Sequence, residues 1–199
     1  MSYAVKEIFK TLQGEGAHAG RPAVFCRFSG CNLGCTFCDT DYAGVDGTDG
    51  GRYDSAGDLV AAIERVWDGP SARRFVVLTG GEPLLQVDAG LVARLHERAF
   101  EVAVETNGTL HAPLGIDWIC VSPKSRDGLK LRAGNELKLV YPQAEVPPEA
   151  FADLAFDRFS LQPMDGPALA ENTARAVAYC LAHPRWQLSL QTHKYLGIR

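Results

Sequence analysis

Apolar, β-branched runs alternate with helical patterns along most of the chain. Four stretches predict helices, at residues 56–67, 88–99, 148–154 and 168–181; Ser55 precedes the first and Pro167 the last, residue types that favour helix starts. The seven apolar runs that predict strands are residues 23–28, 75–79, 102–105, 118–122, 136–140, 159–161 and 186–190. Strands that alternate with helices are typical of parallel strands joined by crossover helices.

The length of the chain limits how large such a fold can be. At 199 residues and 46% hydrophobic, the chain predicts a single domain over residues 1–199. An eight-unit barrel needs about 250 residues, so we expect an α/β fold built as a partial, truncated TIM-like barrel. Residues 41–53 are rich in glycine and aspartate and predict a solvated loop, with a lid or a partner surface as the alternative.

The charge of the chain narrows the classes of partner. A formal net charge of −4 argues against a broad nucleic-acid or membrane surface, so small-molecule substrates are favoured. No apolar run approaches 18 residues, and the first residues lack the pattern of a secretory signal. We therefore expect a cytoplasmic protein, in a compartment where thiols stay reduced.

The most informative motif is C-N-L-G-C-T-F-C, which places Cys31, Cys35 and Cys38 in a C-x3-C-x2-C spacing. Three thiolates on one short loop can hold a 4Fe-4S cluster by three of its irons and leave the fourth iron without a protein ligand. An open iron can bind the amino and carboxylate groups of S-adenosylmethionine, and an electron from the cluster can then release a 5'-deoxyadenosyl radical.

A zinc-binding interaction module is the alternative reading of these cysteines. Structural zinc usually takes four protein ligands in paired C-x2-C units. The other cysteines, Cys26, Cys120 and Cys180, are scattered singly through apolar runs. The spacing therefore favours the cluster.

Polar and glycine-rich motifs follow four of the predicted strands. In a barrel of parallel strands such ends meet at one mouth, so we expect the active site there. The glycines of the first motif allow close backbone approach, and Glu82 offers a carboxylate for an ammonium group. The four motifs are Thr79-Gly80-Gly81-Glu82-Pro83, Glu105-Thr106-Asn107-Gly108, Ser122-Pro123-Lys124 and Gln162-Pro163-Met164-Asp165.

The cysteine motif with Phe37 before Cys38, together with the Gly-Gly-Glu-Pro segment at residues 80–83, resembles the radical S-adenosylmethionine superfamily. Within it, residues 11–16 (T-L-Q-G-E-G), Arg27, the step Cys38-Asp39-Thr40 and residues 191–194 (Q-T-H-K) resemble the 7-carboxy-7-deazaguanine synthases of queuosine biosynthesis. This similarity extends over essentially the whole chain.

The resemblance implies a radical lyase that contracts the ring of 6-carboxy-5,6,7,8-tetrahydropterin and releases ammonia. It also implies a magnesium ion at Thr40, a homodimer, and an electron donor such as flavodoxin, for which residues 41–53 are a candidate docking surface. The implied cofactor-binding residues are Phe37, Cys38, Asp39, Gly80, Gly81, Glu82, Ser122, Pro123, Lys124, Gln162, Pro163, Met164 and Asp165. The implied substrate-binding residues are Leu12, Gln13, Gly14, Glu15, Arg27, Thr79, His193 and, through its terminal carboxylate, Arg199.

The chemistry of some of these residues supports the assignment. A pterin carboxylate and an aminopyrimidinone edge need a fork-shaped cation and hydrogen-bond acceptors, which Arg27, Gln13 and Glu15 provide. Arg27 lies inside an apolar strand, where an unpaired guanidinium is costly, although a surface ion pair is the alternative. His193 reaches the mouth if the last strand carries it there. The nearest rival function is a glycyl-radical activating enzyme, which acts on a protein backbone instead.

Overall fold

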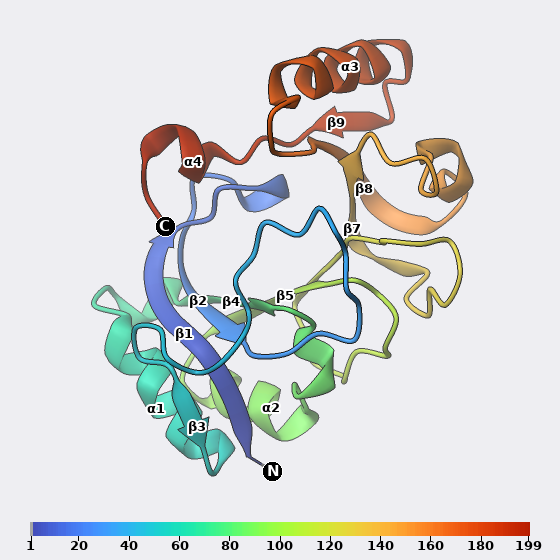
Figure 1. The fold of residues 1–199 in the computed structure, drawn as a ribbon. Helices are drawn as coiled ribbons and strands as arrows, with labels where there is room; N and C mark the ends of the chain where they lie inside the picture. Colours follow the sequence, from blue (N-terminus) through green and yellow to red (C-terminus); the bar gives the residue numbers. More distant parts are fainter. Residues whose placement is uncertain (1) are drawn as a thin grey trace.

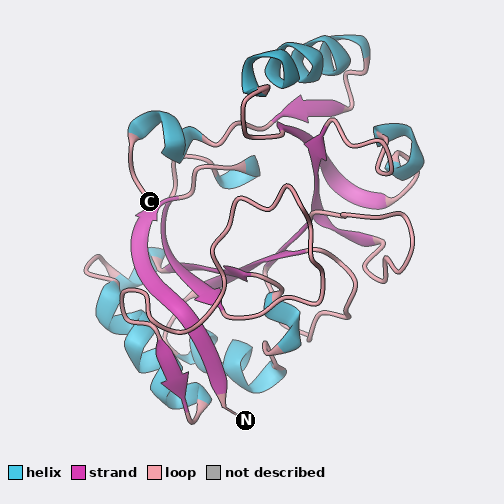
Figure 2. Ribbon diagram, in the orientation of Figure 1, coloured by secondary structure: helices cyan, strands magenta, loops and turns pink. Residues whose placement is uncertain are grey.

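The computed structural model of the chain describes residues 2–199 and is built on one nine-stranded sheet (Figures 1 and 2). The order of the strands is β3-β1-β2-β4-β5-β6-β7-β8-β9, and every neighbouring pair from β2 to β9 is parallel. The sheet curves but β3 and β9 do not pair, so the fold is the predicted truncated barrel. The strands are β1 (Tyr3–Leu12), β2 (Pro22–Phe28), β3 (Gly51–Tyr53), β4 (Phe75–Gly80), β5 (Glu101–Thr106), β6 (Trp118–Val121), β7 (Ala133–Tyr141), β8 (Ala155–Pro163) and β9 (Trp186–Leu188).

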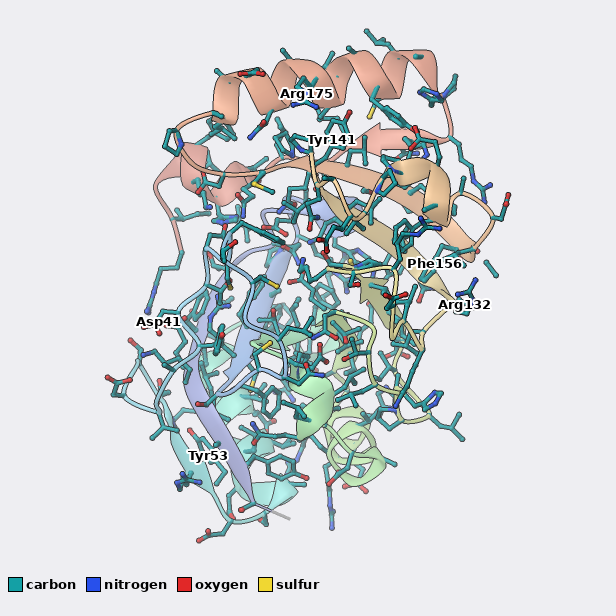
Figure 3. The ribbon with its side chains drawn as sticks, turned by 45° about the vertical axis from the view of Figure 1, so that its right-hand side comes forward. Asp41, Tyr53, Arg132, Tyr141, Phe156 and Arg175 are labelled. Carbon is teal, nitrogen blue, oxygen red and sulfur yellow. The ribbon has the colours of Figure 1, made fainter. Side chains whose placement is uncertain are left out.

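Helices cover the outer face of the sheet and create its core. Helix α1 (Ala56–Val66) and α2 (Ala89–Glu97) bury their apolar faces in a cluster that includes the outward side chains of β2, β4 and β5. Helix α3 (Leu169–Ala182) packs on β8 and β9, and its Arg175 lies over the ring of Tyr141, 5.9 Å from the ring centroid (Figure 3). The predicted helix start at Ser55 is confirmed, since its hydroxyl accepts a hydrogen bond from the Asp58 N–H (3.2 Å). The inner face carries a smaller apolar cluster that includes Phe25, Phe75 and Val77, and polar side chains lie toward the carboxyl ends of the strands.

Strand β1 was not predicted, and it changes the topology at one end of the sheet. It pairs antiparallel with both β2 and β3, whereas the sequence pattern predicted only parallel strands. A register shift between Val5 and Glu7 breaks the period-two alternation of β1, so polar and apolar positions do not follow the simple strand pattern. An irregular strand of this kind escapes a search for alternating residues.

Residues 41–50 form the predicted loop, with exposed or half-buried side chains, but residues 51–53 form strand β3 and hydrogen bonds tie the loop to β1. Lys6 of β1 pairs with Asp41 (2.9 Å) and Asp46 (2.8 Å), and the Ile8 N–H donates to the Thr48 carbonyl (2.8 Å). The segment ends in β3, so it runs along β1 and covers the edge of that strand; Figure 3 labels its first and last residues, Asp41 and Tyr53. Covering an edge strand protects its free backbone groups from unwanted pairing.

Two further predictions differ from the structure in the second half of the chain. Residues 148–154 form a single 3₁₀ turn (Pro148–Phe151) rather than an α-helix, because β8 already begins at Ala155 and leaves no room for one. The last strand ends at Leu188, and the chain then forms the short helix α4 (Thr192–Leu196). Among residues 2–199, no helix has the length and apolar character needed to cross a membrane.

Candidate active site

A cavity of about 580 Å³ opens where the parallel strands end. Its wall includes the ends of β4, β5 and β8 and the residues that follow β6, as the strand-end motifs predicted. A volume of this size suits a ligand of drug-like dimensions. The cavity is therefore the place to test each predicted site residue.

The three motif cysteines line this cavity as free thiols. The Cys38 N–H donates to the Cys35 carbonyl (3.2 Å), which closes a tight turn between them. Burial raises the pKa of Cys35, Lys124 opposes that rise, and the thiols of Cys38 and Cys31 add to it. All four residues line the cavity.

The grouping of these thiols fits a cluster better than a single ion. Within residues 2–199, no three His, Cys, Asp or Glu side chains are close enough together to hold one metal ion. A cubane cluster takes one thiolate at each of three irons, so its ligands stand farther apart than those of one zinc ion. Soft thiolate donors beside a lysine suit an anionic iron–sulfur group.

Two glycines bring the end of β4 against the cysteine loop. Gly80 has a φ of +135°, and a Cβ on Gly81 would lie 2.1 Å from the Gly30 carbonyl oxygen. Only glycine permits this approach of two backbones. Gly80 and Gly81 both line the cavity beside Cys31.

Glu82 has a different place from the one predicted. Its side chain is fully buried and does not line the cavity, so its contact with an ammonium group there stays a prediction. The carboxylate accepts hydrogen bonds from the Leu84 N–H (2.9 Å), the Thr106 hydroxyl (2.7 Å) and the Asn107 N–H (2.8 Å). Burial raises the pKa of Glu82, and these three donors oppose the rise. Glu82 thus joins the ends of β4 and β5 and supports the cavity from behind.

Replacing Glu82 with alanine should lower the free energy of unfolding by about 3 kcal/mol, because buried N–H and O–H groups would lose their acceptor. Urea unfolding followed by circular dichroism measures the change. Glu97→Ala, at an exposed carboxylate paired with Arg94, is the matched control and should change stability little. Equal stability of the two variants would contradict the supporting role of Glu82.

Arg27 lies on the inner face of β2. It forms an ion pair, as the alternative prediction had it, and it also lines the cavity, as the substrate-binding prediction requires. Its Nε donates to Glu7 (2.9 Å), which also pairs with Arg199 (2.6 Å), and all three residues line the cavity. Within residues 2–199 the Nη atoms of Arg27 donate no hydrogen bond to the protein. They are therefore available to a carboxylate in the cavity.

A buried group of charged and amide side chains forms another part of the cavity wall. Lys138 of β7 contacts the carboxylates of Glu15 and Glu105, and Gln13 donates to Glu105 (3.0 Å). Gln191 donates to Glu15 (2.9 Å). Lys138 and Glu7 were missed from the sequence, although a lysine within the apolar run L-K-L-V is itself a signal of an inward-facing polar site.

The segment after β9 closes the side of the cavity. Gln191 and Lys194 both bind Asp39 of the cysteine loop (2.9 and 2.7 Å), and Lys194 also binds Asp165 (2.6 Å). Burial alone would raise the pKa of Asp39, but these two donors hold it below its usual range. Neither Gln191 nor Lys194 had been assigned a role from their chemistry.

His193 reaches the cavity on helix α4, and not on a strand as predicted. Its ring packs so closely on Gly14 that a Cβ there would lie 2.1 Å from Nδ1. The Thr192 N–H donates to the Gly14 carbonyl (2.9 Å) and fixes this arrangement.

The structure brings nearly all predicted site residues together. Thr40 is among them, with its hydroxyl 3.5 Å from Asp39 Oδ1. Glu82 and Pro123 do not line the cavity. The predicted residues that do are Leu12, Gln13, Gly14, Glu15, Arg27, Cys31, Cys35, Phe37, Cys38, Asp39, Thr40, Thr79, Gly80, Gly81, Ser122, Lys124, Gln162, Pro163, Met164, Asp165, His193 and Arg199.

Comparison with known proteins agrees with this site. Residues 26–135 match the Radical SAM superfamily. The chain is 65% identical to a 7-carboxy-7-deazaguanine synthase of Bradyrhizobium diazoefficiens and 35% identical to that of Escherichia coli K12, in each case over 100% of both chains. The crystal structure of QueE from Escherichia coli superposes with a TM-score of 0.75 at 32% identity, covering 96% of this chain and 94% of the other.

Proposed function

The chain belongs to the 7-carboxy-7-deazaguanine synthases of the radical S-adenosylmethionine superfamily, and from this membership we propose how its own residues divide the work. The reaction contracts the ring of 6-carboxy-5,6,7,8-tetrahydropterin to 7-carboxy-7-deazaguanine with loss of ammonia. The observation that supports the assignment of residues is that three free thiols, an arginine fork and two carboxylates line one cavity.

Cys31, Cys35 and Cys38 would hold the 4Fe-4S cluster. The cluster would supply the single electron that cleaves bound S-adenosylmethionine, and the resulting 5'-deoxyadenosyl group would take a hydrogen atom from C6 of the pterin. Gly80 and Gly81 leave backbone groups accessible beside Cys31, and the Lys194 ion pairs hold Asp39 and Asp165 in place. The proposed S-adenosylmethionine residues are Phe37, Cys38, Asp39, Gly80, Gly81, Ser122, Lys124, Gln162, Pro163, Met164 and Asp165.

Substrate recognition falls to the β1, β2 and β5 side of the cavity. The free Nη atoms of Arg27 suit the pterin carboxylate, and the acceptor oxygens of Glu15 and Glu105 suit the N–H groups of its aminopyrimidinone ring. Leu12, Gly14, Thr79 and His193 would complete the contact surface. The backbone oxygen of Arg199 is fixed near the cavity by the Thr11 hydroxyl (2.7 Å).

A magnesium ion at Thr40 is part of the proposal. Magnesium keeps several water ligands and takes few from protein, so one hydroxyl at the cavity suffices if substrate oxygens complete the shell. Thr40 lines the cavity between the cysteine loop and β1.

The anaerobic reaction of the reconstituted protein with carboxypterin, S-adenosylmethionine and dithionite tests this function directly. We expect deazapurine absorbance to grow in, and omission of magnesium should raise the KM for the pterin. Absence of product with a full complement of iron would overturn the substrate assignment. A glycyl-radical activating enzyme, the rival, would show no competition between pterin and its protein substrate.

The identity of the electron donor and the oligomeric state are also part of the proposal. A flavodoxin-like donor meets the need for single electrons, and a homodimer would protect the ends of the open sheet. Residues 41–53 carry three aspartates that pair with Lys6 or Arg65 and only one exposed cation, Arg52, so this segment offers little cationic surface to an acidic donor. It is a poor candidate for the docking role predicted from the sequence.

A further inference from the structure

Lys138 is a buried cation to which neither the resemblance nor the proposed function gives a role. It lies in β7, which is flanked by β6 and β8, and its side chain is 6% exposed. Its neighbours Leu137 and Leu139 are fully buried on the outer face, so Lys138 points to the inner face. A buried ammonium group is stable only when opposite charges and hydrogen bonds replace water.

Two carboxylates from distant parts of the chain provide those charges. Glu15, in the loop after β1, contacts Nζ of Lys138, and Glu105 Oε1 of β5 lies 3.5 Å from it. Both carboxylates also line the cavity with Lys138. One cation therefore stands between two anions in the wall of the site.

Neutral donors fix the remaining oxygen atoms. Gln191 donates to Glu15 Oε1 (2.9 Å), Gln13 to Glu105 Oε1 (3.0 Å) and Thr79 to Glu105 Oε2 (3.3 Å). Amide and hydroxyl donors orient a carboxylate but leave its charge in place. Among these contacts only Lys138 balances charge.

The pKa shifts of Glu15 and Lys138 show how these two side chains affect each other. Burial by itself would raise the pKa of Glu15, but the ammonium of Lys138, helped by Gln191 and His193, holds the pKa below its usual range. The two carboxylates in turn raise the pKa of Lys138 against the effect of burial, so it stays charged. Without the cation, the buried Glu15 carboxylate loses its main opposite charge and gains a proton at a higher pH.

We propose that Lys138 is a positioning residue that keeps Glu15 ionised and holds the carboxylates of Glu15 and Glu105 on its ammonium group, so that the cavity offers paired acceptors to the N–H edge of the substrate. A protonated carboxyl would present a donor to the same N–H groups and would repel them. This inference rests on the proposed function, because it takes the aminopyrimidinone ring of the pterin as the ligand of the pair. Lys138 itself need not touch the substrate.

The test compares the wild-type holoenzyme with Lys138→Met, which keeps the length of the stem and removes the charge. The quantity to compare is the KM of the variant for carboxypterin divided by that of wild type. We expect this ratio to be about tenfold or more at pH 6.5 and to fall toward one at pH 8.5. The sign follows because a raised carboxyl pKa means that an acceptor is lost as the pH falls. The kcat should change less than KM, since recognition of the ring acts on ground state and transition state alike.

Other titratable groups near the cavity can also change KM with pH, so the experiment needs a control. The ratio of variant to wild type cancels their contribution where it is common to both proteins, and Lys138→Met/Glu15→Gln removes the carboxylate whose ionisation Lys138 is proposed to maintain. Its KM should have the same pH dependence as that of Glu15→Gln alone. The charged or titratable groups around the pair are Cys120 of β6, Lys124 after β6, Glu136 of β7 and His193 of α4.

The outcomes separate the proposals. A wild-type enzyme that does not turn over carboxypterin overturns the proposed function, and the role of Lys138 with it. Suppose that wild type is active and that the ratio of the Lys138→Met KM to the wild-type KM is the same at every pH. This result overturns the positioning role alone, even if the ratio is large. Iron content and the spectral response to S-adenosylmethionine should equal those of wild type. If Lys138→Met does not fold, the comparison of Lys138→Met/Glu15→Gln with Glu15→Gln tests the proposal instead. A KM that rises at low pH in the double variant but not in Glu15→Gln refutes the proposal.

Discussion

We expect Cys35→Ala to lose the cluster and, with it, all turnover. Cys35 is the middle ligand of the loop, and a cubane held by only two thiolates has lost one of its three attachment points. Iron and labile sulfide measured after anaerobic reconstitution should fall to background, while circular dichroism stays that of the wild-type apoprotein. The effect is larger than that of any other single change proposed above.

Cys180→Ala is the matched control for this experiment. Cys180 is a free thiol on helix α3 and does not line the cavity, so its removal should leave iron, sulfide and product formation intact. A full iron complement in Cys35→Ala would show that the cluster is bound elsewhere. The assignment of all three ligands would then be wrong.

We expect the second largest effect from Arg27→Ala, which should weaken carboxypterin binding by about 2 to 5 kcal/mol. The substrate carboxylate would enter a partly buried site without its cation. Iron content should not change, because Arg27 does not belong to the cysteine loop. The KM for carboxypterin and direct anaerobic titration measure the loss.

The structure also explains why this variant should fold. Glu7 keeps Arg199 as a partner when Arg27 is removed, so no carboxylate is left unpaired. Arg21→Ala is the control: Arg21 also pairs with a glutamate, Glu101, but does not line the cavity. If both variants retain the KM of wild type, Arg27 does not bind substrate.

The residues that the sequence revealed are those whose chemistry is local. Cys31, Cys35 and Cys38 are close in the chain, so their spacing alone predicts a shared ligand. The parallel strands can be recognised as apolar runs. The carboxyl ends of such strands meet at one mouth of the barrel, which predicts that the strand-end motifs lie together. These parts of the prediction needed no knowledge of distant contacts.

The residues that escaped prediction depend on partners far away in the chain. Lys138 and Glu15 are 123 positions apart, and nothing near either residue indicates that they touch. Glu82 is part of a motif but faces away from the cavity, since the turn after Gly81 directs its side chain toward the end of β5. Strand β1 was hidden by its register shift at Val5–Glu7, where the alternation of residues fails.

The segment that closes the side of the cavity has a practical consequence for producing the protein. Arg199 accepts a hydrogen bond from Thr11 through its backbone oxygen, pairs with Glu7 and lies over the ring of Phe9. A purification tag fused after this residue would have to leave from the rim of the substrate site and would compete for these contacts. A tag placed ahead of β1 emerges at the other end of that strand, at a distance from the chemistry (Figure 1).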